Sequence, residues 1–170
     1  MSKIPPGDFM LSPLKEASEL VSFDCSKDDP TNVNDFYRKD AWNYHVNGLS
    51  STTLFKYRDE VVGCISLCMS SIRNDGRVPE PGALDWFGSR IPALFVGQMA
   101  THNNHRNRGV SKNMLIYAYG LAVGISRKIG ARYVWLETDG SLVGFYEKCG
   151  FKTFDRRAEY VLMFRKIIAD

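Results

Sequence analysis

The amino-acid sequence predicts an α+β fold, in which helices cover the faces of a mixed, mostly antiparallel sheet. Three observations lead to this prediction. Apolar, β-branched runs of strand length recur along the chain, two of them lie close enough to form a hairpin, and a long apolar stripe at helical spacing separates later runs. The chain has 170 residues, 44% hydrophobic and 24% charged. These values predict a single globular domain over residues 1–170.

The N-terminal part is expected to contain one amphipathic helix. A short strand at residues 9–11 and a short helical stretch at 15–21 are expected before it. Thr31 or Asn32 is the expected N-cap of the amphipathic helix. The apolar positions at helical spacing are Val33, Phe36, Tyr37, Ala41 and Tyr44.

A β-hairpin is expected next, with strands at 51–57 and 61–69 joined by Arg58-Asp59-Glu60. Residues from about 70 to 91 are rich in glycine and proline, and such a long irregular segment is typically functional or mobile. Basic residues flank it or lie within it: Arg73, Arg77 and Arg90. Several basic residues of the chain on one face would bind RNA phosphates, whereas scattered they would be ordinary solvated charges. The basic residues considered are these three with Arg127, Lys128, Arg132, Arg156, Arg157, Arg165 and Lys166.

The second half alternates strands and helices. The expected elements are a strand at 93–100, a helix with apolar residues from Met114 to Ile129, a strand at 132–138, a short helix at 142–148 and a hairpin of 151–154 with 159–165. Gly150 is expected to end the short helix in a left-handed conformation.

Charge, apolar runs and cysteine spacing together argue against a membrane protein, a secreted protein and a metal-binding protein. The net charge of +3 at pH 7 permits an anionic cofactor or a nucleic acid without requiring either. No apolar run reaches the ~18 residues that cross a membrane, and the N-terminus lacks the apolar core of a signal peptide, so we expect a cytoplasmic protein without a membrane partner. The four cysteines lack zinc-site spacing, and no metal site is expected.

The segment from Met99 to Val123 is the most informative part of the chain. An apolar run leads into a short polar loop, and a helical pattern starts directly after it. The backbone N–H groups of such a loop and the positive end of the helix dipole form an anion site. Gly109 lets the main chain approach a phosphate closely, while Arg106, Arg108 and Lys112 add positive charge. The loop therefore predicts a pyrophosphate site.

Two motifs resemble the GNAT acetyltransferase superfamily. Arg106-Asn107-Arg108-Gly109-Val110-Ser111 is similar to its (Q/R)-x-x-G-x-(G/A) loop, with Ser111 in place of Gly or Ala, and residues 144–151 are similar to its F-Y-x-x-x-G-F motif. The resemblance implies a three-layer fold around a twisted central sheet, and acetyl-CoA as the cofactor. It assigns cofactor binding to Met99, Ala100, Thr101, Arg106, Asn107, Arg108, Gly109, Val110 and Ser111. The hydroxyl of Ser111 would either cap the helix or crowd the phosphate.

Upstream segments resemble one branch of this superfamily. They are Phe23-Asp24-Cys25, Asn34-Asp35-Phe36 and Lys39-Asp40-Ala41. That branch contains toxins that acetylate the amino group of aminoacyl-tRNA. The resemblance thus implies tRNA and an antitoxin as partners, if the chain is such a toxin, and a homodimer is a further expectation because dimers are frequent in the superfamily.

Acetyl transfer from a thioester to an amine needs a neutral amine, a stabilised oxyanion and a proton for the leaving thiolate. The resemblance implies Tyr146 as the general acid and a backbone N–H near Met99 or Ala100 as the oxyanion donor. Tyr146 as a plain core aromatic is the alternative. The general base stays open among Glu137, Asp139, His102 and His105, where the histidines would otherwise bind phosphate or lie exposed.

Three functions follow from these observations. The first is an acetyl-CoA-dependent N-acetyltransferase acting on a primary amine by direct attack in a ternary complex. The second is the same chemistry on aminoacyl-tRNA. The third is a non-catalytic CoA-binding module.

Overall fold

The computed structural model describes residues 2–73 and 90–168. Its strands are ordered β1-β2-β3-β4-β5-β7-β6 in a seven-stranded sheet. The pairs β1–β2, β2–β3, β5–β7 and β6–β7 are antiparallel, and β4–β5 is parallel. The predicted α+β class with a mixed, mostly antiparallel sheet is confirmed. The chain forms two compact units, Met1–Cys68 with Gly97–Tyr117, and Met69–Val96 with Ala118–Asp170.

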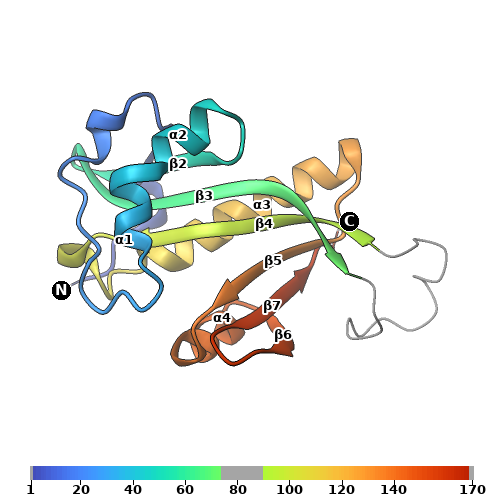
Figure 1. Cartoon of the computed structure of the whole chain (residues 1–170). Helices are drawn as coiled ribbons and strands as arrows, with labels where there is room; N and C mark the ends of the chain where they lie inside the picture. Colours follow the sequence, from blue (N-terminus) through green and yellow to red (C-terminus); the bar gives the residue numbers. More distant parts are fainter. Residues whose placement is uncertain (1, 74–89, 169–170) are drawn as a thin grey trace. The chain divides into compact units, whose positions relative to one another are not determined.

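The first unit contains the N-terminal elements, the start of β3, the end of β4 and the first turns of α3. Its elements are η1 (Pro6–Asp8), β1 (Met10–Pro13), η2 (Ala17–Leu20), α1 (Val33–Asp35), η3 (Phe36–Asp40), α2 (Ala41–Val46), β2 (Ser51–Tyr57), β3 (Glu60–Arg73), β4 (Arg90–Thr101), η4 (Asn103–His105) and α3 (Val110–Ile129). α2 packs against β2 (Figure 1).

The predicted hairpin is confirmed as β2 and β3. Arg58 and Asp59 form its two-residue turn, with φ of 51° and 64°, as a type I′ turn requires. Glu60, expected in the turn, is the first residue of β3 and is paired with Tyr57. β3 and β4 also include residues 70–73 and 90–91, which were expected to be irregular, while Arg77 lies outside the described residues.

The predicted amphipathic helix is present, but its cap and regularity differ from the prediction. Asn32 has a φ of 55° and makes no side-chain cap bond. The carboxylate of Asp29 caps the helix instead, because it accepts the N–H groups of Val33 at 3.0 Å and Asn34 at 2.8 Å. A π-helical segment, η3, then separates α1 from α2, and sequence periodicity does not predict such a wide turn.

The core of the first unit lies between the N-terminal elements and the strands. Its buried members are Leu14, Leu20, Phe23, Cys25, Tyr37, Ala41, Leu54, Val61, Cys64 and Ala100. Burying each large apolar side chain contributes about 1.5–3 kcal/mol. Four of the five predicted helical positions belong to this core: Tyr37 and Ala41 are buried in it, and Val33 and Phe36 pack against it.

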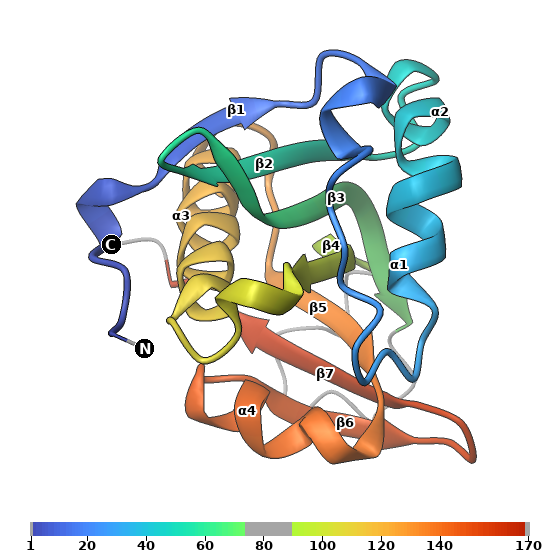
Figure 2. The ribbon, with the colours of Figure 1, turned by 90° about the vertical axis from the view of Figure 1, so that its left-hand side faces the viewer.

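The second unit contains the C-terminal strands. Its further elements are β5 (Tyr133–Thr138), η5 (Gly140–Leu142), α4 (Val143–Lys148), β6 (Lys152–Arg156) and β7 (Val161–Lys166). β7 lies between β5 and β6, and α4 packs beside β6 (Figure 2). A separate core of Ile72, Ile91, Ala93, Tyr133 and Phe164 fills this unit. None of the described helices is long and apolar enough to cross a membrane.

Candidate active site

The loop between β4 and α3 has the backbone of an anion site. Asn107 and Gly109 adopt left-handed φ values of 61° and 85°, which asparagine tolerates and glycine favours. The carbonyl of Gly109 accepts the N–H of Asn113 at 3.1 Å. The earlier N–H groups of α3, from Val110 onward, therefore precede the first helical bond and point out of the helix terminus. This geometry fits the pyrophosphate of acetyl-CoA.

Gly63 of β3 lets α3 approach the strand closely. A Cβ on Gly63 would lie 2.6 Å from Val110 Cγ1, 3.1 Å from Met114 Sδ and 3.3 Å from the Ala100 carbonyl oxygen. The glycine thus fixes the position of the first turn of α3. Sequence reasoning missed this residue, although an isolated glycine inside an apolar strand commonly marks a close approach.

Ser111 is the second residue of α3. Its hydroxyl is 2.8 Å from Thr101 Oγ1, a contact in which either atom can donate. The hydroxyl therefore joins the helix to the end of β4 instead of capping the helix terminus.

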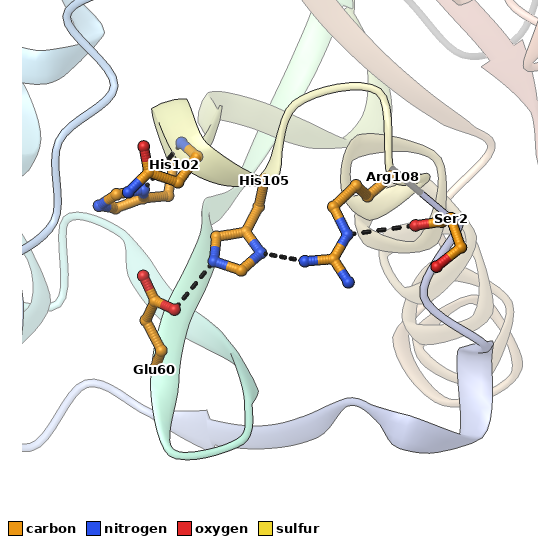
Figure 3. A network of polar contacts seen from close by, with 6 residues as sticks. Ser2, Glu60, His102, His105 and Arg108 are labelled. Carbon is orange, nitrogen blue, oxygen red and sulfur yellow. Dashed lines mark hydrogen bonds and ion pairs between the residues drawn. The ribbon is translucent and has the colours of Figure 1, made fainter.

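The side chains of Glu60, His105 and Arg108 form a network that supports the loop (Figure 3). Arg108 Nη1 lies 2.8 Å from His105 Nδ1. Arg108 is the donor in this hydrogen bond because a guanidinium cannot accept one. The proton of the imidazole is therefore on Nε2, which donates to Glu60 Oε2 at 2.9 Å. His105 is only 7% exposed, so the prediction that it binds phosphate or lies in solvent is wrong.

Arg108 also ties the loop to the N-terminal residues. Its Nε donates to the Ser2 carbonyl at 3.2 Å, and its own carbonyl accepts the N–H of Ile4 at 3.0 Å. Its guanidinium carbon lies 5.3 Å from the ring centroid of Tyr57. Both the side chain and the backbone of Arg108 thus hold the loop in place.

Residues 24–28 hold the other side of the loop. The Asp24 carbonyl accepts the N–H of Asn103 at 2.8 Å, and Asn103 Oδ1 accepts the N–H of Lys27 at 3.2 Å. Arg106 forms an exposed ion pair with Asp28 at 3.2 Å. Arg106 and Arg108 were expected to add charge to the cofactor site, and the side chains of both are bonded to protein groups.

At the end of β4, Met99 is half-buried, while Ala100 is buried. The carbonyl of the preceding residue, Gln98, accepts a hydrogen bond from the Tyr37 hydroxyl at 3.0 Å. The N–H of His102, just after the strand, donates to the Val62 carbonyl of β3 at 2.9 Å. These contacts orient the peptide groups that were predicted to bind the acetyl group.

Tyr146 lies on α4, in the second unit. Its side chain is 8% exposed and packs edge-on against Phe145 and Phe151. Burial raises the pKa of Tyr146 to about 12, against the opposing effect of a hydrogen bond with Thr138. The hydroxyl is therefore protonated at neutral pH and available as a donor.

The glycine of the second motif ends α4 as predicted. Gly150 has a φ of 86°. Its N–H donates to the Glu147 carbonyl, and the N–H of Phe151 donates to the Tyr146 carbonyl. This pattern is a Schellman motif, whose accompanying apolar contact is the pair Tyr146 and Phe151. The motif thus fixes the orientation of the helix turn that carries Tyr146.

Three of the four candidate bases are engaged in structural contacts. His102 is 8% exposed, and its Nδ1 accepts the N–H of Asn104 at 3.2 Å. His105 is held by Glu60 and Arg108. Asp139 accepts the N–H of Ser141 at 2.8 Å, and hydrogen bonds from Ser141 lower the pKa of this carboxyl. Glu137 is exposed on β5.

Comparisons with known proteins identify the family. Residues 50–153 match the acetyltransferase (GNAT) domain family, and the chain therefore belongs to this family. This confirms the predicted acetyltransferase class and its acetyl-CoA cofactor. No curated protein sequence matches the chain.

Solved structures share the fold over nearly their whole length. AtaT complexed with acetyl-methionyl-tRNAfMet has 19% identity and a TM-score of 0.73, covering 93% of this chain and 95% of that chain. AtaTR bound with acetyl-CoA has 19% identity and a TM-score of 0.76, covering 95% of each chain. A tyrosine-to-phenylalanine mutant of KacT has 16% identity and a TM-score of 0.78, covering 94% of this chain and 95% of that chain.

Proposed function

We propose that residues 1–170 act as one domain that transfers the acetyl group of acetyl-CoA to the α-amino group of an aminoacyl-tRNA, by direct attack in a ternary complex. The observation that carries the proposal is the shared fold with AtaT complexed with acetyl-methionyl-tRNAfMet, which covers 93% of this chain and 95% of that chain. The positive net charge of +3 is compatible with an RNA substrate.

The candidate bases support an acceptor of low basicity. His102, His105 and Asp139 are engaged in structural contacts, and the hydrogen bonds that lower the pKa of Asp139 make it a weaker base. A lysine side chain has a pKa of ~10.4 and needs help to lose its proton, whereas an α-amino group, at ~7.7–8.0, is partly neutral at physiological pH. The ester linkage of an aminoacyl-tRNA lowers that basicity further, so little base catalysis is required.

Each part of the site then has a role. The main-chain N–H groups at the start of α3 hold the pyrophosphate of acetyl-CoA, which supplies the acetyl group as a thioester. A backbone N–H at Met99 or Ala100 stabilises the charge that develops on the acetyl oxygen. Tyr146 donates a hydrogen bond to the leaving sulfur. Its pKa of about 12 exceeds that of a thiol, ~8.5, so Tyr146 is protonated again at the end of the reaction. The amine loses one proton as the amide forms, and the CoA thiol gains one, so the protons balance.

Partners and location follow from the substrate. The toxin AtaT is known bound to the C-terminus of the antitoxin AtaR, and we extend an antitoxin partner to this chain as part of the proposal. Aminoacyl-tRNA and acetyl-CoA must both be present where the enzyme works, which places it in the cytoplasm under this proposal.

The experiment is transfer of label from radiolabelled acetyl-CoA into a cell extract by the wild type and by Tyr146→Phe. The products are then treated separately with nuclease and with protease. The proposal expects nuclease-sensitive label that depends on Tyr146. Protease-sensitive label, or label that survives both treatments, would instead indicate a protein or small-molecule acceptor, and no transfer would indicate a non-catalytic CoA-binding module.

A further inference from the structure

Tyr37 is the buried aromatic residue whose hydroxyl reaches the end of β4. It lies in the π-helical segment η3 and is 2% exposed. Phe23 and Phe36 pack edge-on against its ring, with centroids at 5.7 Å and 5.3 Å. Because the ring is fixed by packing, the hydroxyl has a defined position. The π-helical turn that carries Tyr37 is also of a kind that is frequent at functional sites.

The hydroxyl of Tyr37 donates to the Gln98 carbonyl at 3.0 Å. This carbonyl and the N–H of Met99 belong to the same planar peptide group and point in opposite directions. A hydrogen bond to the carbonyl draws electron density from the nitrogen, which makes the Met99 N–H a stronger donor.

The strand geometry distinguishes Met99 from Ala100. Successive N–H groups of an extended strand point to opposite edges. The N–H of His102 donates to Val62 of β3, so the N–H of Ala100, two residues earlier, points toward β3 as well. The N–H of Met99 points to the opposite edge, and Met99 lies beyond Val96, the last β4 residue paired with β5. Met99 N–H is therefore the donor directed away from the β3 ladder.

We infer that Tyr37 is a positioning residue, which polarises the Gln98–Met99 peptide so that the Met99 N–H stabilises negative charge on the acetyl oxygen. The inference rests on the proposed function and selects one of its two candidate N–H groups. It also gives a role to a tyrosine that was predicted only as a core position.

A second layer of hydroxyl groups supports Tyr37. Thr52 Oγ1 and Ser66 Oγ, from paired positions of β2 and β3, are 2.7 Å apart. Ser66 Oγ donates to the Tyr37 hydroxyl at a longer distance of 3.5 Å. The donors thus form a chain from Thr52 through Ser66 and Tyr37 to the Gln98 carbonyl. Hydrogen bonds in such a chain reinforce one another by about 10–30% per bond.

This series of hydrogen bonds, from Thr52 to Gln98, determines the size of the expected effect on kcat. Removing a complete oxyanion donor lowers kcat by about 10²- to 10³-fold. Losing about 10–30% of that stabilisation corresponds to a decrease of about 2- to 8-fold. Tyr37→Phe keeps the ring in its packing and removes only the hydroxyl.

The test compares Tyr37→Phe with Tyr117→Phe as a matched control. Tyr117 also lies in the first unit, and its hydroxyl pairs with Thr53 at 3.2 Å, away from Gln98. We would measure kcat, the Kd for CoA and the infrared carbonyl stretch of bound acetyl-CoA labelled with ¹³C at the thioester carbon. CoA lacks the acetyl group, so its Kd reports only the remaining cofactor contacts.

For Tyr37→Phe we expect a kcat about 2- to 8-fold lower, an unchanged Kd for CoA, and a carbonyl band moved to higher wavenumber. Tyr117→Phe should match the wild type in all three. Ser66→Ala should move the band in the same direction by less, and it serves if Tyr37→Phe does not fold. An unchanged band overturns the inference, even if stability falls. A wild type without acetyl transfer would instead refute the proposed function.

Discussion

The close approach of β3 to α3 at Gly63 predicts that one added methyl group weakens both the fold and cofactor binding. In Gly63→Ala the new Cβ would lie 2.6 Å from Val110 Cγ1, whereas carbon atoms pack best at about 3.5–4.0 Å. Val110 is 1% exposed and Met114 is 0% exposed, so neither can move into open space. The first turn of α3 must therefore shift by about 1 Å.

The energetic consequence can be bounded. Overpacking a core costs about 1–3 kcal/mol, and replacing a strand glycine returns about 0.5–1 kcal/mol, so we expect Gly63→Ala to lose about 0.5–2 kcal/mol of unfolding free energy. The shift also displaces the N–H groups of α3 that we propose hold the pyrophosphate. A hydrogen bond to a charged group contributes about 1.5–3 kcal/mol, and weakening one of them raises the Kd for CoA about tenfold.

The matched control is Gly124→Ala, in the interior of α3. No atom lies within 4 Å of a Cβ at that position, so the helix should gain about 0.5–1 kcal/mol, with an unchanged Kd for CoA. Urea denaturation gives the stabilities, and isothermal titration calorimetry gives the Kd. If Gly63→Ala equals the wild type in both measurements, the packing of α3 on β3 does not position the phosphate site.

Three further predictions concern buried groups. His105→Ala removes both hydrogen bonds of the loop network, so it should cost about 2–3 kcal/mol in unfolding free energy and raise the Kd for CoA. Glu60→Gln, at a half-exposed position, should cost less than about 1 kcal/mol. Equal losses of unfolding free energy in the two variants would contradict this prediction. Burial raises the pKa of Tyr146 to about 12 from ~10 in an unfolded chain, so the stabilising effect is complete below pH 10 and is lost as the pH rises toward 12. From pH 9 to pH 11 the wild type should therefore lose about 1.4 kcal/mol more than Tyr146→Phe, and parallel pH profiles in urea denaturation would refute this. Burial also raises the pKa of Cys25 to about 12. Iodoacetamide at pH 8 should therefore leave Cys25 unmodified in the folded protein and modify it only after unfolding. Mass spectrometry would detect the modification.

The succession of strands and helices along the chain and the two motifs could be predicted from the sequence because both depend on local patterns. Alternating apolar residues indicated β2 and β3, and the apolar stripe indicated α3. The conformation of Gly150 was predicted correctly because a glycine after the last helical residue commonly adopts a left-handed backbone conformation. Such features require only neighbouring residues, and they are therefore visible in a single chain.

Contacts between distant residues were not predictable. The approach of Gly63 to Val110 and the hydrogen bond between Glu60 and His105 join segments that lie far apart in the sequence. Arg106 and Arg108 were expected to add positive charge to the loop. Their side-chain partners, Asp28, Ser2 and His105, could not be predicted because they depend on the fold.

The most direct test of acetyl transfer to aminoacyl-tRNA uses the purified chain, radiolabelled acetyl-CoA and a mixture of aminoacyl-tRNAs. The same tRNAs after deacylation, and a lysine-containing peptide, serve as alternative acceptors. We expect label on the aminoacyl-tRNA that is released by mild alkali as N-acetyl-amino acid and is lost with Tyr146→Phe. Efficient labelling of the peptide, with none of the aminoacyl-tRNA, would contradict it.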